Sequence, residues 1–365
     1  MREIHSLAEF DAQLASGGAL DGVVVQGVDL SDRTDALLAA TCAGATFLGA
    51  NLSDAALRHV HDAGAVVFPG LPDLPFDPYR PHLYDQAELL DGWRPGVDFG
   101  HARDSVIYRW ADQHPRGTHL PVIDALARRL HDHAIDDALR DHLDQHPDVV
   151  AVMGGHNLTR GDSIYRAITE LGRALARAGL HVATGGGPGA MEAANLGAWL
   201  APHPDDALTD AIEILQEAPV FEDTDPYLSA GARVTAAWPD GGSSLALPTW
   251  FYGHEPTNQF ATHIAKYFAN SIREDGLLAI ATRGVVFAPG SAGTVQEIFQ
   301  DATQNHYEVF DTVSPMVLFG VGYWTDTLPA LALLQKLAGE RRYAPLVAAA
   351  DTADEVVALI VDAAD

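Results

Sequence analysis

Three glycine-rich segments contain the residues best suited to chemistry. They are MGGHNLTRGDS at 153–163, TGGGPGAM at 184–191 and APGSAGT at 288–294. Glycine lets the backbone approach a ligand closely, and a helix that follows such a turn offers unpaired N–H groups and a positive dipole end to an anion. Sharp strand-to-helix turns also need glycine for steric reasons alone, so each segment by itself is a weak indication. Together the three segments predict a phosphate-binding site.

None of these segments is a standard nucleotide motif. No GKS or GKT follows to complete a Walker loop, and none reads GxGxxG with the usual acidic residue after the next strand. Ordinary ATP and NAD sites are therefore disfavoured.

Carboxylates recur on one face of the helix predicted after the third segment. Counting from Thr294, Glu297 and Asp301 lie at helical spacing, with apolar residues on the other side. We place Glu297 in the first turn, one turn from a phosphate bound before the helix. Such a carboxylate suits an acid that acts on a phosphosugar, and the alternative is an acidic face that solvent covers.

Two basic residues lie on a segment, 258–275, whose spacing predicts a helix. Lys266 and Arg273 are seven residues apart, which puts them two turns apart on one side, where both could neutralise a phosphate or hold a ribose hydroxyl. For Arg273 the alternative is a local ion pair with Glu274 and Asp275, which follow it directly.

Other chemistries lack the residues that they need. His131 and His133 point to different faces of a helix, and HEPTN at 254–258 lacks the second histidine of HExxH, so no metal site is expected. Ser291 is not the nucleophile of a GxSxG elbow, because proline stands two residues before it. Cys42 is expected to be a small core residue.

The segments that must position these residues alternate between strand and helix from residue 148 onward. This alternation predicts an α/β fold, a Rossmann-like doubly wound parallel sheet with helices on both faces. All three glycine segments would then lie at the carboxyl edge of the sheet, where ligands bind. The predicted strands are DVVAVMGG, LHVATGGG, SLALPTWFYG, GVVFAPG and SPMVLFG.

Residues 1–145 form a smaller mixed region with different features. DGVVVQGVDL and GATFLGANL resemble strand-and-turn repeats, the proline-dense stretch 71–84 predicts an ordered arm, and 120–146 has helical spacing. We therefore expect an N-terminal accessory domain at 1–145, a nucleotide-binding catalytic domain at 146–345 and a C-terminal helix at 346–365.

Composition limits the partners. The chain has 365 residues, and its 50 acidic against 22 basic residues give a net charge of −28, which repels polyphosphate backbones and anionic membranes. Neither nucleic acid nor a membrane is an expected partner. A single cysteine excludes an intrachain disulfide and fits a cytoplasmic location.

At this point the motifs are similar to those of a known family. TGGGPGAMEAAN, followed about a hundred residues later by PGSAGTVQE, resembles the paired GGGxxGxM and PGGxGTxxE motifs of the LONELY GUY (LOG) family of nucleoside 5′-monophosphate phosphoribohydrolases. HIAKYFANSIREDGLLA, DATQNHY and the proline-rich arm look closer still to the larger bacterial pyrimidine/purine nucleotide 5′-monophosphate nucleosidases. One departure is Ser291, which stands where the family motif has its second glycine.

The resemblance implies a hydrolase that cleaves the N-glycosidic bond of a nucleoside 5′-monophosphate, with no cofactor, in a homodimer or higher homo-oligomer. Glu297 would activate the attacking water or hold the ribose hydroxyls, with Asp301 as a weaker second candidate. Arg273, or alternatively Lys266, would contact the phosphosugar. Met191 and residues 249–254 would line the base pocket. The residues expected to bind the 5′-phosphate are Gly290, Ser291, Ala292, Gly293 and Thr294, together with Gly186 and Gly187 from the neighbouring turn.

Two alternatives stay open. A cytokinin riboside 5′-monophosphate phosphoribohydrolase would differ only in the base pocket. A non-catalytic carrier of a nucleotide or of the molybdenum cofactor would also bind phosphate, but it would have no need of Glu297.

Overall fold

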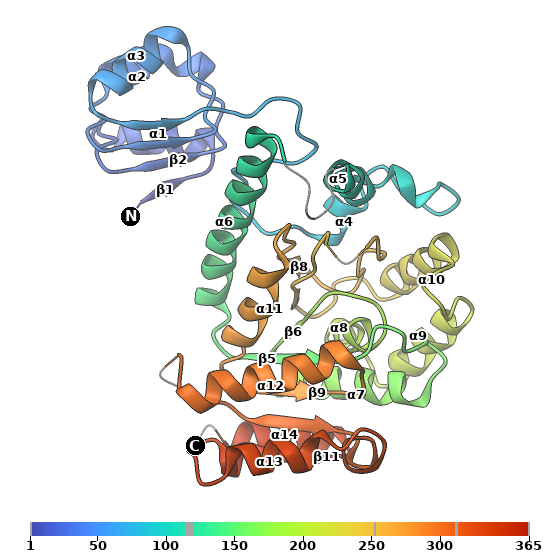
Figure 1. The fold of residues 1–365 in the computed structure, drawn as a ribbon. Helices are drawn as coiled ribbons and strands as arrows, with labels where there is room; N and C mark the ends of the chain where they lie inside the picture. The colour runs from blue at the N-terminus through green and yellow to red at the C-terminus, as the bar shows by residue number, and fades with distance from the viewer. Residues whose placement is uncertain (1, 114–119, 252, 311–312, 364–365) are drawn as a thin grey trace. The chain divides into compact units, whose positions relative to one another are not determined.

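The chain forms two units, which were identified in a computed structural model (Figure 1). The first unit comprises Met1–Leu83 and Asp112–Asp141, and the second comprises Tyr84–Ala111 and His142–Asp365. The sequence analysis placed 84–111 in the N-terminal domain and treated 346–365 as separate, whereas both segments belong to the second unit. The structure describes residues 2–113, 120–251, 253–310 and 313–363.

A seven-stranded sheet, parallel throughout, is the centre of the second unit. Its order is β11-β10-β9-β5-β6-β7-β8, so the chain runs outward from β5 to β8 and then returns to place β9 on the other side of β5. This reversal confirms the predicted doubly wound α/β fold, and it creates a crevice at the carboxyl ends of β5 and β9. The strands are β5 (Val149–Met153), β6 (His181–Thr184), β7 (Ser244–Ala246), β8 (His263–Ile264), β9 (Gly284–Phe287), β10 (Met316–Phe319) and β11 (Val347–Ala350).

Helices flank this sheet as two groups (Figure 1). Helix α7 packs on α8 and α14, whereas α12 packs on α11 and α13. Every residue of β5 and β9 is buried, which explains why these strands read as continuous apolar runs. The helices of the second unit are α4 (Gln86–Leu89), α5 (Arg103–Asp112), α7 (Ser163–Arg177), α8 (Ala190–Trp199), α9 (Asp206–Gln216), α10 (Thr224–Ala237), α11 (Asn270–Ala279), α12 (Ala292–Tyr307), α13 (Ala330–Ala338) and α14 (Ala353–Asp362), with short turns at Phe99–His101, Tyr323–Thr327 and Ala344–Leu346.

The first unit is built on a smaller parallel sheet of order β1-β2-β3-β4. The expected strand-and-turn repeats are confirmed, and a helix that the sequence analysis did not predict precedes each of β2, β3 and β4. The predicted helix at 120–146 is α6, although its first turns are exposed. The elements are β1 (Glu3–Ile4), α1 (Leu7–Ala15), β2 (Val24–Gln26), η1 (Ser31–Arg33), α2 (Thr34–Ala39), β3 (Thr46–Leu48), α3 (Asp54–Asp62), β4 (Val66–Phe68) and α6 (Val122–Gln145).

The proline-dense arm is ordered, as predicted, and contains neither helix nor strand from 71 to 83. Phe76 and Tyr79 are buried, and the Tyr79 ring lies against Gly49. Gly49 has a φ of +63°, so both its backbone conformation and the adjacent ring require the absence of a side chain. Cys42 is buried in the core of the same unit, also as expected.

The predicted helix over 258–275 is wrong. The chain forms strand β8 at His263–Ile264, Tyr267 then pairs with Thr249 in a parallel bridge, and α11 begins only at Asn270. The apolar residues of this stretch are buried on every side, and a fully buried strand cannot be distinguished from a helix by periodicity. Lys266 and Arg273 therefore do not lie on one helix.

No helix among the described residues is both long enough and apolar enough to cross a membrane.

Candidate active site

All three glycine-rich segments line one cavity of about 490 Å³, a volume in the range of small-molecule sites. The turn after β5 contributes 154–156, the turn after β6 contributes 185–187, and the start of α12 contributes 291–294. The segment after β7 closes the cavity with 255–258. The sequence predicted this convergence, because the carboxyl ends of parallel strands meet at one edge of a sheet.

Hydrogen bonds tie the turn after β6 to helix α8. Thr184 Oγ1 accepts a hydrogen bond from Gly186 N–H (3.0 Å) and donates to Asn195 Oδ1 (2.7 Å), which ties the turn to α8. Gly186 has a φ of +75°, a conformation that favours glycine. Under the same helix, Arg160 donates from Nε and Nη2 to the two carboxylate oxygens of Glu192, each at 2.8 Å, within the core. These contacts tie the first two glycine segments to α8.

The start of α12 offers N–H groups to the cavity. The first N–H to donate within the helix is that of Val295, to Ser291 O at 3.0 Å, so the N–H groups of 292–294 have no acceptor within the helix. They lie at the positive end of the helix dipole, which favours an anion. Gly290 is not among the described residues that line the cavity: it packs against the Thr294 side chain, and its carbonyl accepts from the Tyr323 hydroxyl (2.6 Å).

Glu297 and Arg273 form an ion pair on the cavity wall. Arg273 Nη1 lies 3.7 Å from Glu297 Oε1, the two side chains are 11% and 16% exposed, and Arg273 Nε donates to Leu247 O (2.9 Å). Burial raises the pKa of Glu297 to about 7, Arg273 lowers it, and the negative charge of Glu274 raises it. The Glu297 carboxyl therefore titrates near neutral pH.

Two details of the sequence analysis need correction here. Helix α12 begins at Ala292, so Glu297 is its sixth residue and lies in the second turn, not the first. The local ion pair considered for Arg273 is replaced by the pair with Glu297, and Glu274 and Asp275 instead accept hydrogen bonds from glutamine side chains of α12.

The structure does not bring Asp301 to the cavity. Its side chain is buried, with Asn305 Nδ2 donating to Oδ1 at 3.3 Å, and burial raises its pKa well above the ordinary value. Asp301, the second carboxylate of the predicted polar face, is thus neither exposed to solvent nor part of the cavity lining.

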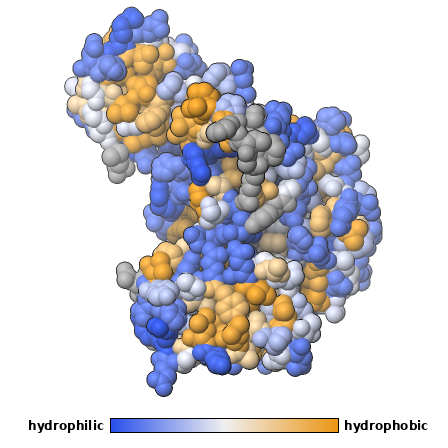
Figure 2. Space-filling view, viewed as in Figure 1, coloured by the Kyte–Doolittle hydropathy of each residue, from blue (hydrophilic) through white to orange (hydrophobic). Residues whose placement is uncertain are grey.

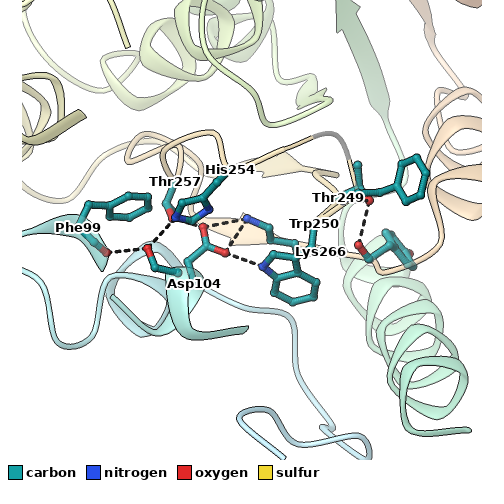
Figure 3. A network of polar contacts seen from close by, with 10 residues as sticks. Phe99, Asp104, Thr249, Trp250, His254, Thr257 and Lys266 are labelled. Carbon is teal, nitrogen blue, oxygen red and sulfur yellow. Dashed lines mark hydrogen bonds and ion pairs between the residues drawn. The ribbon is translucent and has the colours of Figure 1, made fainter. Parts of the chain in front are cut away.

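Lys266 lines the cavity, but a carboxylate already neutralises its charge. Lys266 Nζ donates to Asp104 Oδ1 at 2.7 Å and to Oδ2 at 2.8 Å, and Trp250 Nε1 and Thr257 Oγ1 donate to the same carboxylate at 2.7 Å each (Figure 3). Burial by itself would raise the pKa of Asp104, but the Lys266 ammonium and the hydrogen bonds from Lys266 and Thr257 together outweigh burial and lower that pKa. Sequence reasoning missed Asp104.

The segment expected to line the base pocket is only partly exposed to the cavity. Thr249 and Gly253 line it together with Met191 from α8, whereas Trp250 is buried in the Asp104 network. Tyr252 lies outside the described residues.

His254 does not line the cavity, and its contacts anchor the loop after β7. Its ring lies between those of Phe99 and Tyr108, with centroids 4.8 and 4.6 Å away. Its Nε2 shares a hydrogen bond of 2.7 Å with Ser105 Oγ. Segment 84–111 thus holds the loop after β7, and its Leu89 reaches the cavity itself.

A second pair in the cavity escaped the sequence analysis. His156 Nδ1 lies 3.1 Å from Glu255 Oε1, and both residues line the cavity, with side chains 51% and 30% exposed. His156 belongs to the first glycine segment and Glu255 to the HEPTN stretch, which was considered only as half of a metal motif. The two residues are 99 positions apart, so no local spacing links them.

His263 is not among the described residues that line the cavity. It begins β8, at the amino end of the strand, and its ring centroid lies 4.3 Å from that of His142. His142 Nε2 and His181 Nε2 are 3.0 Å apart, and burial lowers the pKa of each to about 3, so both rings are neutral at pH 7. Among the described residues, those close enough to share a metal ion as three ligands are Glu3, His5 and Asp141, in the first unit.

Comparisons with known proteins find similar structures only. No family model matches the chain, and no curated protein matches its sequence. The molybdenum cofactor binding protein of the phototrophic bacterium Rippkaea orientalis is 14% identical, with 60% of this chain and 99% of that chain covered and a TM-score of 0.40. The molybdenum cofactor carrier protein of Chlamydomonas reinhardtii is 16% identical, with 59% of this chain and 96% of that chain covered and a TM-score of 0.37. TM1055, a structural genomics target, is 22% identical, with 59% of this chain and 99% of that chain covered and a TM-score of 0.37. Similarity this low indicates nothing about activity.

Proposed function

We propose that this protein hydrolyses the N-glycosidic bond of nucleoside 5′-monophosphates, releasing a free base and ribose 5-phosphate. One observation carries the proposal: the start of α12, which suits a phosphate, and the buried Glu297–Arg273 pair share one cavity with the two other glycine turns. The resemblance of the glycine motifs to the LOG family supports the same activity.

The chemistry follows from the charges. As the bond breaks, positive charge develops on C1′ and on the ring oxygen of the ribose, as in glycoside hydrolysis. The carboxylate of Glu297 stabilises that charge and takes the proton of the attacking water. Arg273 keeps part of the Glu297 population ionised at neutral pH, and it lies close enough to the carboxylate to contact the phosphosugar as well. Lys266, neutralised by Asp104, supports the loop after β7 and does not bind phosphate.

The activity is tested with purified protein and a panel of nucleoside 5′-monophosphates, with chromatography for free base. Release of base from the common nucleotides supports the proposal, whereas release from N6-isopentenyl-AMP alone would identify a cytokinin-type enzyme. Tight binding of nucleotide or molybdenum cofactor without release of base would identify a carrier. The homo-oligomeric state remains a prediction of the resemblance, and the cytoplasmic location remains a prediction from the single cysteine.

We expect strict dependence on the 5′-phosphate. Loss of the contacts between the phosphate and the N–H groups of 292–294 removes charge-assisted hydrogen bonds of about 1.5 to 3 kcal/mol each, so kcat/KM for adenosine should be at least about a hundredfold below that for AMP. Adenosine 3′-monophosphate, which has the same charge at another position, is the matched control and should be as poor as adenosine. Equal turnover of AMP and adenosine would exclude the α12 terminus as the phosphate site.

Replacing Arg273 should act through Glu297. In Arg273→Ala the carboxylate loses its only described cation neighbour within 4 Å, so its pKa rises from about 7 and less of it is ionised. We expect kcat/KM at pH 6.5 to fall by about tenfold or more and the loss to shrink at pH 8.5. Arg342→Ala, which removes an exposed pair with Glu308, is the control. A loss that is independent of pH would place Arg273 on the phosphate alone.

A further inference from the structure

The proposed reaction needs two groups on opposite sides of the ribose. Water attacks C1′ from the face opposite to the base, while the electron pair of the C1′–N bond moves onto the base, which leaves more easily when an acid protonates it. Glu297 serves the water. The acid for the base is a separate group, and the cavity must provide it across the ribose from Glu297.

Among the described residues that line the cavity, His156 and Glu255 are the pair available to provide this acid. Besides Glu297 and Arg273, the titratable side chains on the wall are those of Lys266, Glu274, His156 and Glu255. The ammonium of Lys266 is held by both oxygens of Asp104. Glu274 directly follows Arg273 and accepts from Gln296 Nε2 (3.4 Å), so it lies on the Glu297 side.

The second glycine turn contacts both that pair and the Glu297–Arg273 pair. Gly185 lies against Arg273, the partner of Glu297, whereas Gly187 lies against Glu255, since a side-chain carbon there would come within 2.9 Å of Glu255 Oε2. These two glycines are at most about 7 Å apart along the chain. The pair of Glu297 with Arg273 and the pair of His156 with Glu255 therefore contact opposite ends of one turn.

Glu255 is also fixed from outside the cavity. Its neighbour His254 lies between two aromatic rings and bonds Ser105. Thr257 donates to the buried Asp104 (Figure 3). A carboxylate on a loop anchored at both sides has a defined position. It orients the His156 ring by the contact of 3.1 Å between Nδ1 and Oε1.

On the basis of the proposed function, we propose that His156 is the acid that protonates the departing base and that Glu255 positions it. As the C1′–N bond breaks, its electron pair goes to the base and the His156 Nε2 proton moves to a ring nitrogen of the base. The water oxygen bonds to C1′, and its proton moves to Glu297. Proton exchange with solvent returns both groups to their initial state, so the net reaction consumes one water.

The test compares two leaving groups. Guanosine 5′-monophosphate needs a proton to release guanine, whereas 7-methylguanosine 5′-monophosphate already carries positive charge on its base and leaves as neutral 7-methylguanine. His156→Asn keeps a hydrogen bond to Glu255 without a transferable proton. We expect it to lower kcat for the first substrate by about a hundredfold and for the second by less than threefold, within the usual contribution of acid–base catalysis. Glu255→Gln should show the same selectivity with a smaller loss.

Glu297→Gln is the internal comparison, because it should slow both substrates equally. His101→Asn, an exposed histidine away from the cavity lining, should change neither rate. Equal losses for both substrates in His156→Asn, or a raised KM with unchanged kcat, would overturn the acid role and assign His156 to the phosphate. Wild-type protein that hydrolyses neither substrate would instead refute the proposed function itself.

Discussion

Glu297→Gln should lower kcat by a hundredfold or more while the Kd for nucleotide changes by less than about threefold. The substitution keeps size and hydrogen bonding but removes a negative charge that the substrate needs only as the ribose becomes cationic. Interactions that strengthen in the transition state affect turnover and not binding, and loss of one such group costs on the order of 10² to 10³ in rate. Single-turnover rates and equilibrium binding of the same nucleotide measure the two effects separately.

The pH profile gives this prediction a second readout. Because the carboxylate is the active form and burial raises the Glu297 pKa to about 7, kcat/KM of the wild type for 7-methylguanosine 5′-monophosphate, which needs no acid, should rise with pH and level off above 7. That limb should disappear in Glu297→Gln. A variant that keeps near wild-type turnover with a normal fold would remove Glu297 from catalysis, and a carrier would then explain the cavity better.

Glu297→Gln should lower activity but raise the stability of the fold at alkaline pH. The folded state holds the Glu297 proton between the ordinary carboxyl pKa of 4.5 and about 7, so the free energy of unfolding falls as pH rises through that window. At pH 8 the ionised, buried carboxyl costs about 3 kcal/mol, which Gln does not incur. We therefore expect Glu297→Gln to melt higher than wild type at pH 8 and similarly at pH 5. If the Glu297→Gln protein melts in this way, unfolding cannot explain a loss of its activity.

Much of the fold could be predicted from the sequence, because buried parallel strands appear as short apolar runs that end in glycine. The same rule explains the failures. Edge strand β11 has the sequence VAAA, which gives a weak signal, and helices α9 and α10 lie in a stretch that no motif marked. Around β8 the apolar residues fit two periods equally well, so a buried strand was taken for a helix.

The residues of the candidate site also divide into those that the sequence could predict and those that it could not. The glycine turns and Glu297 could be found locally, since each follows a strand or belongs to the helix after it. The side chains that complete the cavity come from remote pairs: Asp104 meets Lys266 across 162 positions, and His156 meets Glu255 across 99. Spacing carries no information about such contacts, and for this reason Lys266 was predicted to bind the phosphosugar when it is part of a buried ion pair.

This correction leads to the last prediction, that Lys266→Met destabilises the fold. Asp104 is fully buried and holds its negative charge beside the Lys266 ammonium. Removing one partner of such a pair leaves an uncompensated charge and costs about 3 to 5 kcal/mol. For a unit of this size we expect the melting temperature to fall by roughly 10 °C. Thermal and denaturant unfolding at pH 7 measure the loss.

A double variant separates this role from substrate binding. In Asp104→Asn/Lys266→Met the charge is gone, while the amide oxygen can still accept from Trp250 or Thr257, so most of the lost stability should return. Asp104→Asn alone leaves the ammonium buried without its counterion and should also be destabilised. If Lys266 instead held the phosphosugar, Lys266→Met would melt normally with a raised KM, and the second substitution would recover nothing. Recovery in the double variant can arise only from the buried pair, because neither Asn nor Met provides a charge for a phosphate.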